Sequence, residues 1–214
     1  MTTSWQLTAI RTEVRERMGL STGDTAVTDA ILTDLVNAAN RKISLYHDWP
    51  WLVQDNDDFV ATVVGQRKYD VTVPADDWRK TLVLVVDGDQ VLSPKQPQDI
   101  HRYANQTGFP YFYAISGTDI YLAPTPDAVY TVLHMYVKDP AVLSGDTDVV
   151  AVEDWAIDLL IEQTCVLVAK RLRDDSLARS FQEELSITLE SMRDEVRRTR
   201  QLPLPRHRTD VAWP

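Results

Sequence analysis

The stretch DDSLARSFQEELSITLESMRDEVRRTR, residues 174–200, decides how the rest of the chain is interpreted. Its apolar residues recur at steps of three and four, which places them on one face of an α-helix. At about 1.5 Å per residue such a helix is roughly 35 Å long. The next residues, QLPLPRHRTDVAWP, cannot continue it, because Pro203 and Pro205 lack an N–H and clash with the preceding turn. The predicted apolar stripe comprises Leu177, Phe181, Leu185, Leu189, Met192 and Val196.

The segment before this helix supplies a packing partner for it. From Glu153 to Arg173 the sequence indicates a second helix, with apolar residues from Trp155 to Ala169 on nearly all sides. A helix of this kind is buried on most of its surface, so we expect it at the centre of a bundle. Asp174 and the next residue form a short connection that caps the last helix. The two helices are therefore predicted to form an antiparallel hairpin.

Two more helices are predicted at the N-terminal end. The first covers Ser4 to Met18, where Thr3 and Gln6 have the spacing of a capping box. The second begins at Thr28 and ends before Pro50, which cannot lie inside a helix. Tryptophans on both sides of that proline are interpreted as an aromatic lid on the helical core, with a ligand site as the less favoured alternative.

Between the two pairs of helices, residues 59–138 alternate between apolar and polar, which is typical of β-strands. Residues 60–64 and 68–73 are predicted to form one hairpin, and residues 111–115 and 119–123 a second. Asp87-Gly88 is a strong tight-turn signal after a buried strand at 81–86. A short helix is expected at 97–105 and a last strand at 129–137. We expect one small antiparallel sheet of about five or six strands.

These elements define an α+β fold. It combines an antiparallel bundle of about four helices with an inserted small antiparallel β-sheet lobe and an extended C-terminal tail. The predicted organisation is 1–52 for the N-terminal helices, 53–145 for the β lobe, 146–200 for the C-terminal helical hairpin and 201–214 for an extended docking tail.

The charge of the chain is large and unevenly distributed. The formal net charge of the 214 residues is −10, which argues against general binding of nucleic acid because phosphate contacts need a basic surface. From Arg197 onward, however, there are five arginines and a single acidic residue, Asp210. A basic tail on an acidic body indicates a docking arm for an acidic partner, or a self-assembly device.

The remaining composition points to a protein used without export. Cys165 is the single cysteine, which fits a reducing cytoplasm. No run of residues is long and apolar enough to cross a bilayer, and the N-terminus carries no signal-type core. We expect a soluble protein.

No catalytic motif stands out, and we expect neither an enzyme nor a cofactor or metal site. The chain has no Gly-rich phosphate loop, nucleophile elbow, His-Glu-x-x-His motif or Cys-x-x-Cys pair. Asp55, Asp57 and Asp58 resemble a calcium loop only loosely, and a solvated acidic turn is favoured over it. The four histidines lack metal-ligand spacing, and strand alternation could turn His134 outward.

Several short motifs follow one another in a specific order. Asp48–Leu52 closes the second helix, and Val64–Tyr69, Gly108–Tyr111 and Gly117–Pro126 follow in the β region, before the closing pair of helices. In their order and spacing, from about Asp29 to Arg198, they resemble the head-to-tail connector (adaptor) proteins of tailed bacteriophages.

The resemblance implies a structural protein of the virion. Members of this family form a ring, commonly twelve-fold, beneath the portal protein at the capsid vertex, after assembly in the host cytoplasm. The ring extends the DNA channel, lets DNA pass without sequence-specific binding, and docks the tail or stopper proteins. The C-terminal segments of the family reach the portal. The expected portal-binding residues are Arg197, Arg198, Arg200, Leu202, Leu204, Arg206, Arg208, Val211 and Trp213.

Two alternatives stay open at this point. A DNA-binding packaging factor would use the basic tail to grip nucleic acid, with a steep dependence on salt. A stopper or tail-completion protein would lie one layer further from the portal. For Trp213, folding back onto its own bundle is the alternative to portal binding.

Overall fold

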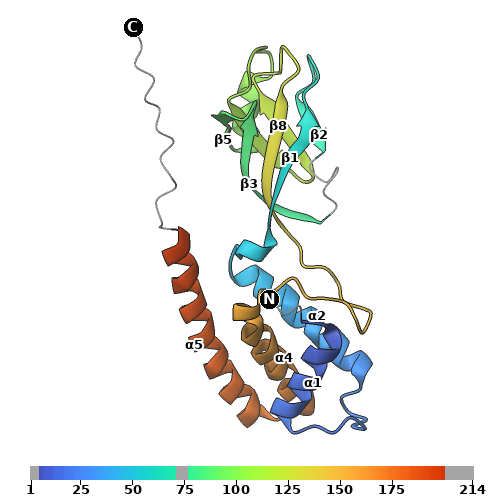
Figure 1. Ribbon diagram of the computed structural model, residues 1–214. Coiled ribbons are helices and arrows are strands. Elements are labelled where there is room, and N and C mark those ends of the chain that lie inside the picture. The colour runs from blue at the N-terminus through green and yellow to red at the C-terminus, as the bar shows by residue number, and fades with distance from the viewer. Residues whose placement is uncertain (1–4, 71–76, 201–214) are drawn as a thin grey trace. The chain divides into compact units, whose positions relative to one another are not determined.

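The computed structural model describes residues 5–70 and 77–200, apart from the side chains at positions 57, 58, 199 and 200. The chain divides into two compact units (Figure 1). The helical unit comprises Met1–Pro50 and Val142–Pro214, and the β unit comprises Trp51–Ala141. The α+β class predicted from the sequence is confirmed.

Four helices pack together in the helical unit, as predicted. They are α1 (Leu7–Met18), α2 (Asp29–Tyr46), α4 (Ile157–Leu172) and α5 (Asp175–Arg200). Helix α4 contacts all three of the others, and a 3₁₀ turn, η3 (Asp154–Ala156), leads into it. Eleven residues of α4 are buried, including Glu162, Gln163 and Thr164. Its apolar character on nearly all sides therefore does correspond to the centre of the bundle.

Local hydrogen bonds mark three of the helix ends, with an exception at the start of the first helix. The Thr28 hydroxyl accepts from the Ile31 N–H at the start of α2. Asp174 Oδ1 accepts from the Leu177 N–H, 2.9 Å away, so the predicted cap of α5 is confirmed. Helix α4 ends at Arg173 in the left-handed conformation, with φ 59°.

The exception is the first helix, which was predicted to begin at Ser4. It begins at Leu7, and Gln6 makes no side-chain cap. The Leu7 N–H donates instead to the Asp148 carbonyl, and Gln6 forms a β-bridge with Val149. The start of α1 thus involves a partner more than 140 residues away, which sequence spacing cannot indicate; Thr3 of the predicted capping box lies outside the described residues.

The β unit contains two four-stranded sheets, where one had been predicted. The first has the strand order β1-β8-β3-β4 and the second β2-β7-β6-β5. All pairs are antiparallel except β5 and β6, which are parallel. The strands are β1 (Val53–Ala61), β2 (Lys68–Asp70), β3 (Trp78–Val86), β4 (Gln90–Val91), β5 (Ser93–Pro94), β6 (Phe112–Ser116), β7 (Asp119–Ala123) and β8 (Thr131–Lys138).

The predicted hairpin between residues 60–64 and 68–73 is wrong for its described part, and residues 71–73 lie outside the described residues. Strand β1 pairs with β8 and strand β2 with β7, so the two segments belong to different sheets. Alternation along the chain identifies a strand but not its partner. The turns at Asp87-Gly88 and Ser116-Gly117 do join antiparallel neighbours, as predicted. Asp87 and Gly88 both have positive φ, 51° and 77°, which is the requirement of a type I′ turn.

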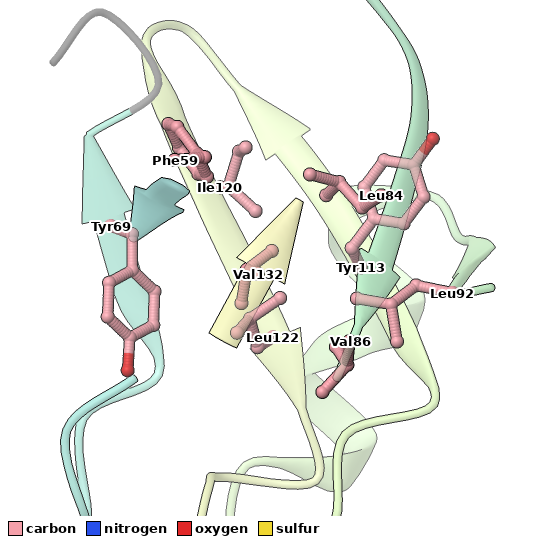
Figure 2. Packing of buried hydrophobic residues seen from close by; sticks show 9 residues of the cluster. All are labelled: Phe59, Tyr69, Leu84, Val86, Leu92, Tyr113, Ile120, Leu122 and Val132. Carbon is pink, nitrogen blue, oxygen red and sulfur yellow. The ribbon is translucent and has the colours of Figure 1, made fainter. Parts of the chain in front are cut away.

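The two sheets share one hydrophobic core (Figure 2). Side chains of β1, β3 and β8 meet side chains of β2, β6 and β7 there. The expected short helix occurs as α3 (Pro97–Ile100), with proline in its first turn, and η2 (His101–Tyr103). A further 3₁₀ turn, η1 (Pro50–Leu52), precedes β1. The core residues are Phe59, Tyr69, Leu84, Val86, Leu92, Tyr113, Ile120, Leu122 and Val132.

Candidate assembly surfaces

The acidic residues at positions 55, 57 and 58 lie inside strand β1, not in the solvated turn that was expected. Over the residues that the structure covers, no group of three or more His, Cys, Asp or Glu is placed to hold a metal ion. Within the same residues, no helix has the length and apolarity required to span a bilayer.

His134 is fully buried, whereas alternation had left it free to face solvent. Its ring lies against Phe59 and Tyr136, with centroid distances of 4.7 and 5.0 Å. The Nε2 atom is 2.9 Å from the Thr81 hydroxyl, and Nδ1 has no hydrogen-bond partner within the described ranges. Burial lowers the pKa of His134 to about 4, so the ring is neutral at physiological pH. His134 is a packing residue of the β unit.

The predicted aromatic lid is present at Trp49. Its side chain is fully buried, and its indole N–H donates to the Ile43 carbonyl at 2.8 Å. This bond satisfies a carbonyl in the last turn of α2, where intrahelical partners run out. Trp49 therefore closes the end of α2 against the core.

The predicted portal-binding residues fall in two groups. Arg197 and Arg198 are exposed near the end of α5, where Arg197 lies 3.6 Å from Asp194 and Arg198 4.0 Å from Glu195. Arg200 is the last residue of α5, and its side chain is outside the described part. The others also lie outside the described residues; they are Leu202, Leu204, Arg206, Arg208, Val211 and Trp213.

Charges of both signs alternate along the outer face of α5. Glu190, Arg193, Asp194 and Arg197 line an open hollow of about 240 Å³ near its C-terminal end. Each arginine in this region has a carboxylate within one turn, so the surface is mixed rather than uniformly basic. A mixed surface favours contact with protein over contact with a run of phosphates.

A groove lined by both apolar and polar side chains lies beside the middle of α5. Trp155 from η3 and Ile187 from α5 border it, together with Thr188, Ser191 and others, and its volume is about 370 Å³. The exposed fractions are 70% for Ile187 and 44% for Trp155. Trp155 had been predicted to lie among the buried residues of α4, and this is wrong. It precedes α4 and reaches the surface.

A second exposed apolar pair lies at the end of α2. Leu45 is 70% exposed and Tyr46 is 48% exposed. Arg41 and Lys42 precede Leu45 by four and three residues, which makes them its neighbours on the helix surface. Neither residue forms an ion pair with any residue in the described part of the chain.

The β unit carries an apolar tip formed by Val63, Val64 and Val129, all exposed. The turn that holds the first two is braced from below by the Tyr69 hydroxyl. That hydroxyl donates to the Gln66 carbonyl at 2.8 Å and accepts from the Val63 N–H at 3.0 Å. The Tyr69 hydrogen bonds therefore hold the turn in place, with the valine side chains exposed to solvent.

Sequence reasoning missed Leu45, Ile187 and the tip valines as surface residues. The signal for Ile187 was available, because it lies between Leu185 and Leu189 but outside their stripe. Leu45 likewise lies two residues after the buried Ile43, nearly opposite it on the helix. An apolar residue off the buried face of an amphipathic helix marks an unpartnered surface.

Both units have well-packed cores and expose apolar residues flanked by charged ones. Such surfaces are features of a structural protein that acts through contacts with other proteins. The chain is a phage adaptor protein by family. The family model described as SU10 adaptor protein matches residues 5–208, and the chain belongs to the SU10 adaptor protein family. This match confirms the predicted resemblance. No curated protein shows significant similarity to the chain.

Proposed function

We propose that this protein joins the head of a tailed phage to its tail. Copies of the chain form a ring beneath the portal protein, extend the DNA channel and dock tail or stopper proteins. The C-terminal helix and the segment after it bind the portal. The observation that carries this proposal is the adaptor family match, which continues past the end of α5 to residue 208.

The charge at the end of α5 supports a protein partner for this segment. The pairs that Arg197 and Arg198 form with Asp194 and Glu195 are exposed, and such pairs contribute roughly 0–1 kcal/mol each. They are easily exchanged for carboxylates of a partner, where desolvation strengthens charge-assisted hydrogen bonds. The leucines and the tryptophan predicted to bind farther along would add the apolar area that anchors an interface.

The acidic body fits a protein that DNA passes without being held. The residues before Arg197 include 31 acidic and 17 basic side chains. Negative charge repels phosphate, so DNA would slide past such a surface. A packaging factor that grips DNA would need a uniformly basic surface, and the described part of the basic end carries carboxylates beside its arginines.

The test is co-sedimentation with purified portal rings of the same phage. Deleting residues 200–214 is expected to leave the helical unit folded, because the buried stripe of α5 ends at Val196, and to abolish co-sedimentation. Arg179→Gln is the control, since it removes an exposed charge at the other end of α5. A truncated chain that still sediments with portal contradicts the proposed binding segment. Salt-sensitive binding of duplex DNA that is lost on truncation would favour the packaging factor instead.

A further inference from the structure

The helical unit has two exposed apolar pairs that its own core does not use. One is Trp155 with Ile187 at the groove beside α5, and the other is Leu45 with Tyr46 on α2. Ile187 points away from α4, because Leu185 and the other buried residues of α5 lie nearly opposite it on the helix. Leu45 and Ile187 are directed outward, so each is available to a partner.

The charges around the two pairs are opposite in sign. Glu183, Glu184 and Glu190 are four, three and three residues from Ile187, so they surround it on the surface of α5. All three are exposed, and none forms an ion pair with a residue that the structure describes. On α2, Arg41 and Lys42 stand beside Leu45 in the same way and are also unpaired there. The acidic residues around Ile187 are thus complementary in charge to the basic residues beside Leu45.

The two surfaces lie at the same height along α4. Tyr46 Oη contacts Gln163 Oε1 at 3.4 Å, and the Thr188 hydroxyl donates to Glu162 Oε1 at 3.2 Å. Gln163 and Glu162 are adjacent residues, so α2 at Tyr46 and α5 at Thr188 are level with each other. Copies joined through these two surfaces would therefore be shifted little relative to one another along α4.

The two surfaces cannot meet within one copy. Helix α4 lies between α5 on one side and α1 and α2 on the other (Figure 1). Leu45 and Ile187 also lie on the faces of α2 and α5 opposite the buried residues that contact α4. Contact between the acidic and the basic surface therefore requires two copies of the chain.

We propose that α2 of one copy docks on α5 of the next. Leu45 enters the groove bordered by Trp155 and Ile187, with the exposed part of Tyr46 at its edge, while Arg41 and Lys42 pair with the glutamates around Ile187. Because the two surfaces differ, the contact is head-to-tail, and it closes into a ring when the rotation from copy to copy adds up to a full turn. The proposal rests on the ring of the proposed function and specifies the faces through which its copies meet.

Cysteine cross-linking tests the contact directly. The chain carrying both Leu45→Cys and Ile187→Cys is expected to form a ladder of dimers and higher oligomers on mild oxidation. Each single variant should give no cross-linked species, and an equal mixture of the two should give cross-linked dimers only. The native Cys165 does not interfere, because it is buried and burial raises the pKa of its thiol to about 12.

A matched control uses the same helix. In Leu45→Cys with Ser180→Cys the second cysteine is also exposed on α5, but it lies seven residues, or about 10 Å, from Ile187. This pair should give little ladder. Dimers from either single variant would indicate a symmetric contact and overturn the proposal, as would equal ladders from both cysteine pairs.

Charge reversal supplies a second measurement. Adding Arg41→Glu and Lys42→Glu to the cross-linking variant should reduce the ladder at least about tenfold, since like charges then face each other. Further adding Glu183→Lys and Glu184→Lys to the same chain should restore it, because both faces are then reversed. Failure of the second pair of changes to restore cross-linking would contradict the proposed pairing.

The experiment is repeated on chains bound to portal rings, which separates the two proposals. Binding to portal without cross-linking, in solution or on the ring, would refute the α2–α5 contact and leave the adaptor function standing. A ladder from a chain that does not bind portal would support the contact and refute the proposed portal attachment.

Discussion

Protonation of His134 is expected to destabilise the β unit as the pH falls. The ring is fully buried, and its pKa is about 4 in the folded protein against about 6.5 in an unfolded chain. The unfolded state therefore binds the proton first as the pH is lowered. The stability linked to neutral His134 is complete above pH 6.5 and is lost as the pH falls to about 4.

The magnitude follows from the difference in pKa. At about 1.4 kcal/mol per unit, the full loss is about 3 kcal/mol, and about 2 kcal/mol is already lost at pH 5. Since small domains are stabilised by roughly 5–15 kcal/mol, this change is large enough to measure.

Hydrogen exchange read by mass spectrometry can assign the loss to the β unit. The free energy of opening that β8 peptides report should fall by about 2 kcal/mol between about pH 7 and pH 5. This comparison is made after the pH dependence of intrinsic exchange has been corrected. Peptides from α4, in the other unit, provide an internal comparison.

His134→Phe is the matched variant for this measurement. It keeps an aromatic ring between Phe59 and Tyr136 but cannot be protonated, and Thr81 Oγ1 still accepts from the Trp78 indole N–H at 3.1 Å. Its β8 peptides should show a much smaller pH dependence. Equal pH dependence in the wild type and the variant would refute the assignment to His134.

Two further predictions concern the helical unit. Trp49→Phe should lower the free energy of unfolding by about 1–3 kcal/mol, because the Ile43 carbonyl loses its 2.8 Å donor while the apolar contact is largely kept; an unchanged urea midpoint would contradict this. Glu162→Gln should raise thermal stability at pH 8 by the equivalent of about 1 kcal/mol. The reason is that burial raises the pKa of Glu162, and that one of its carboxylate oxygens has no partner among the described residues. The gain should vanish in acid, where the carboxyl is protonated in both states, and a gain that is equal at both pH values would refute this explanation.

Much of the fold could be predicted from the sequence because the relevant signals are local. The spacing of apolar residues identified the helices, and the nearly uniform apolarity of α4 placed it at the centre of the bundle. Residues with special backbone preferences marked the turns: Asp87-Gly88 adopts positive φ at both positions, and Asp174 caps α5. Each signal depends on residues a few positions apart.

Strand partners and the true surface were decided only by the tertiary structure. Strands β1 and β2 have the alternation of a hairpin, yet each pairs with a strand about 50 or more residues away. Alternation left His134 free to face solvent, but the ring is buried, because Phe59 and Tyr136 pack against it.

The assembly surfaces show the same division. From the residues alone, α5 could be predicted to be amphipathic and its C-terminal end to be basic. Only the packing of both α2 and α5 on α4 showed that Leu45 and Ile187 remain outside, level with each other and bordered by opposite charge. Periodicity reports which residues share a face, whereas burial depends on what the rest of the chain places against that face.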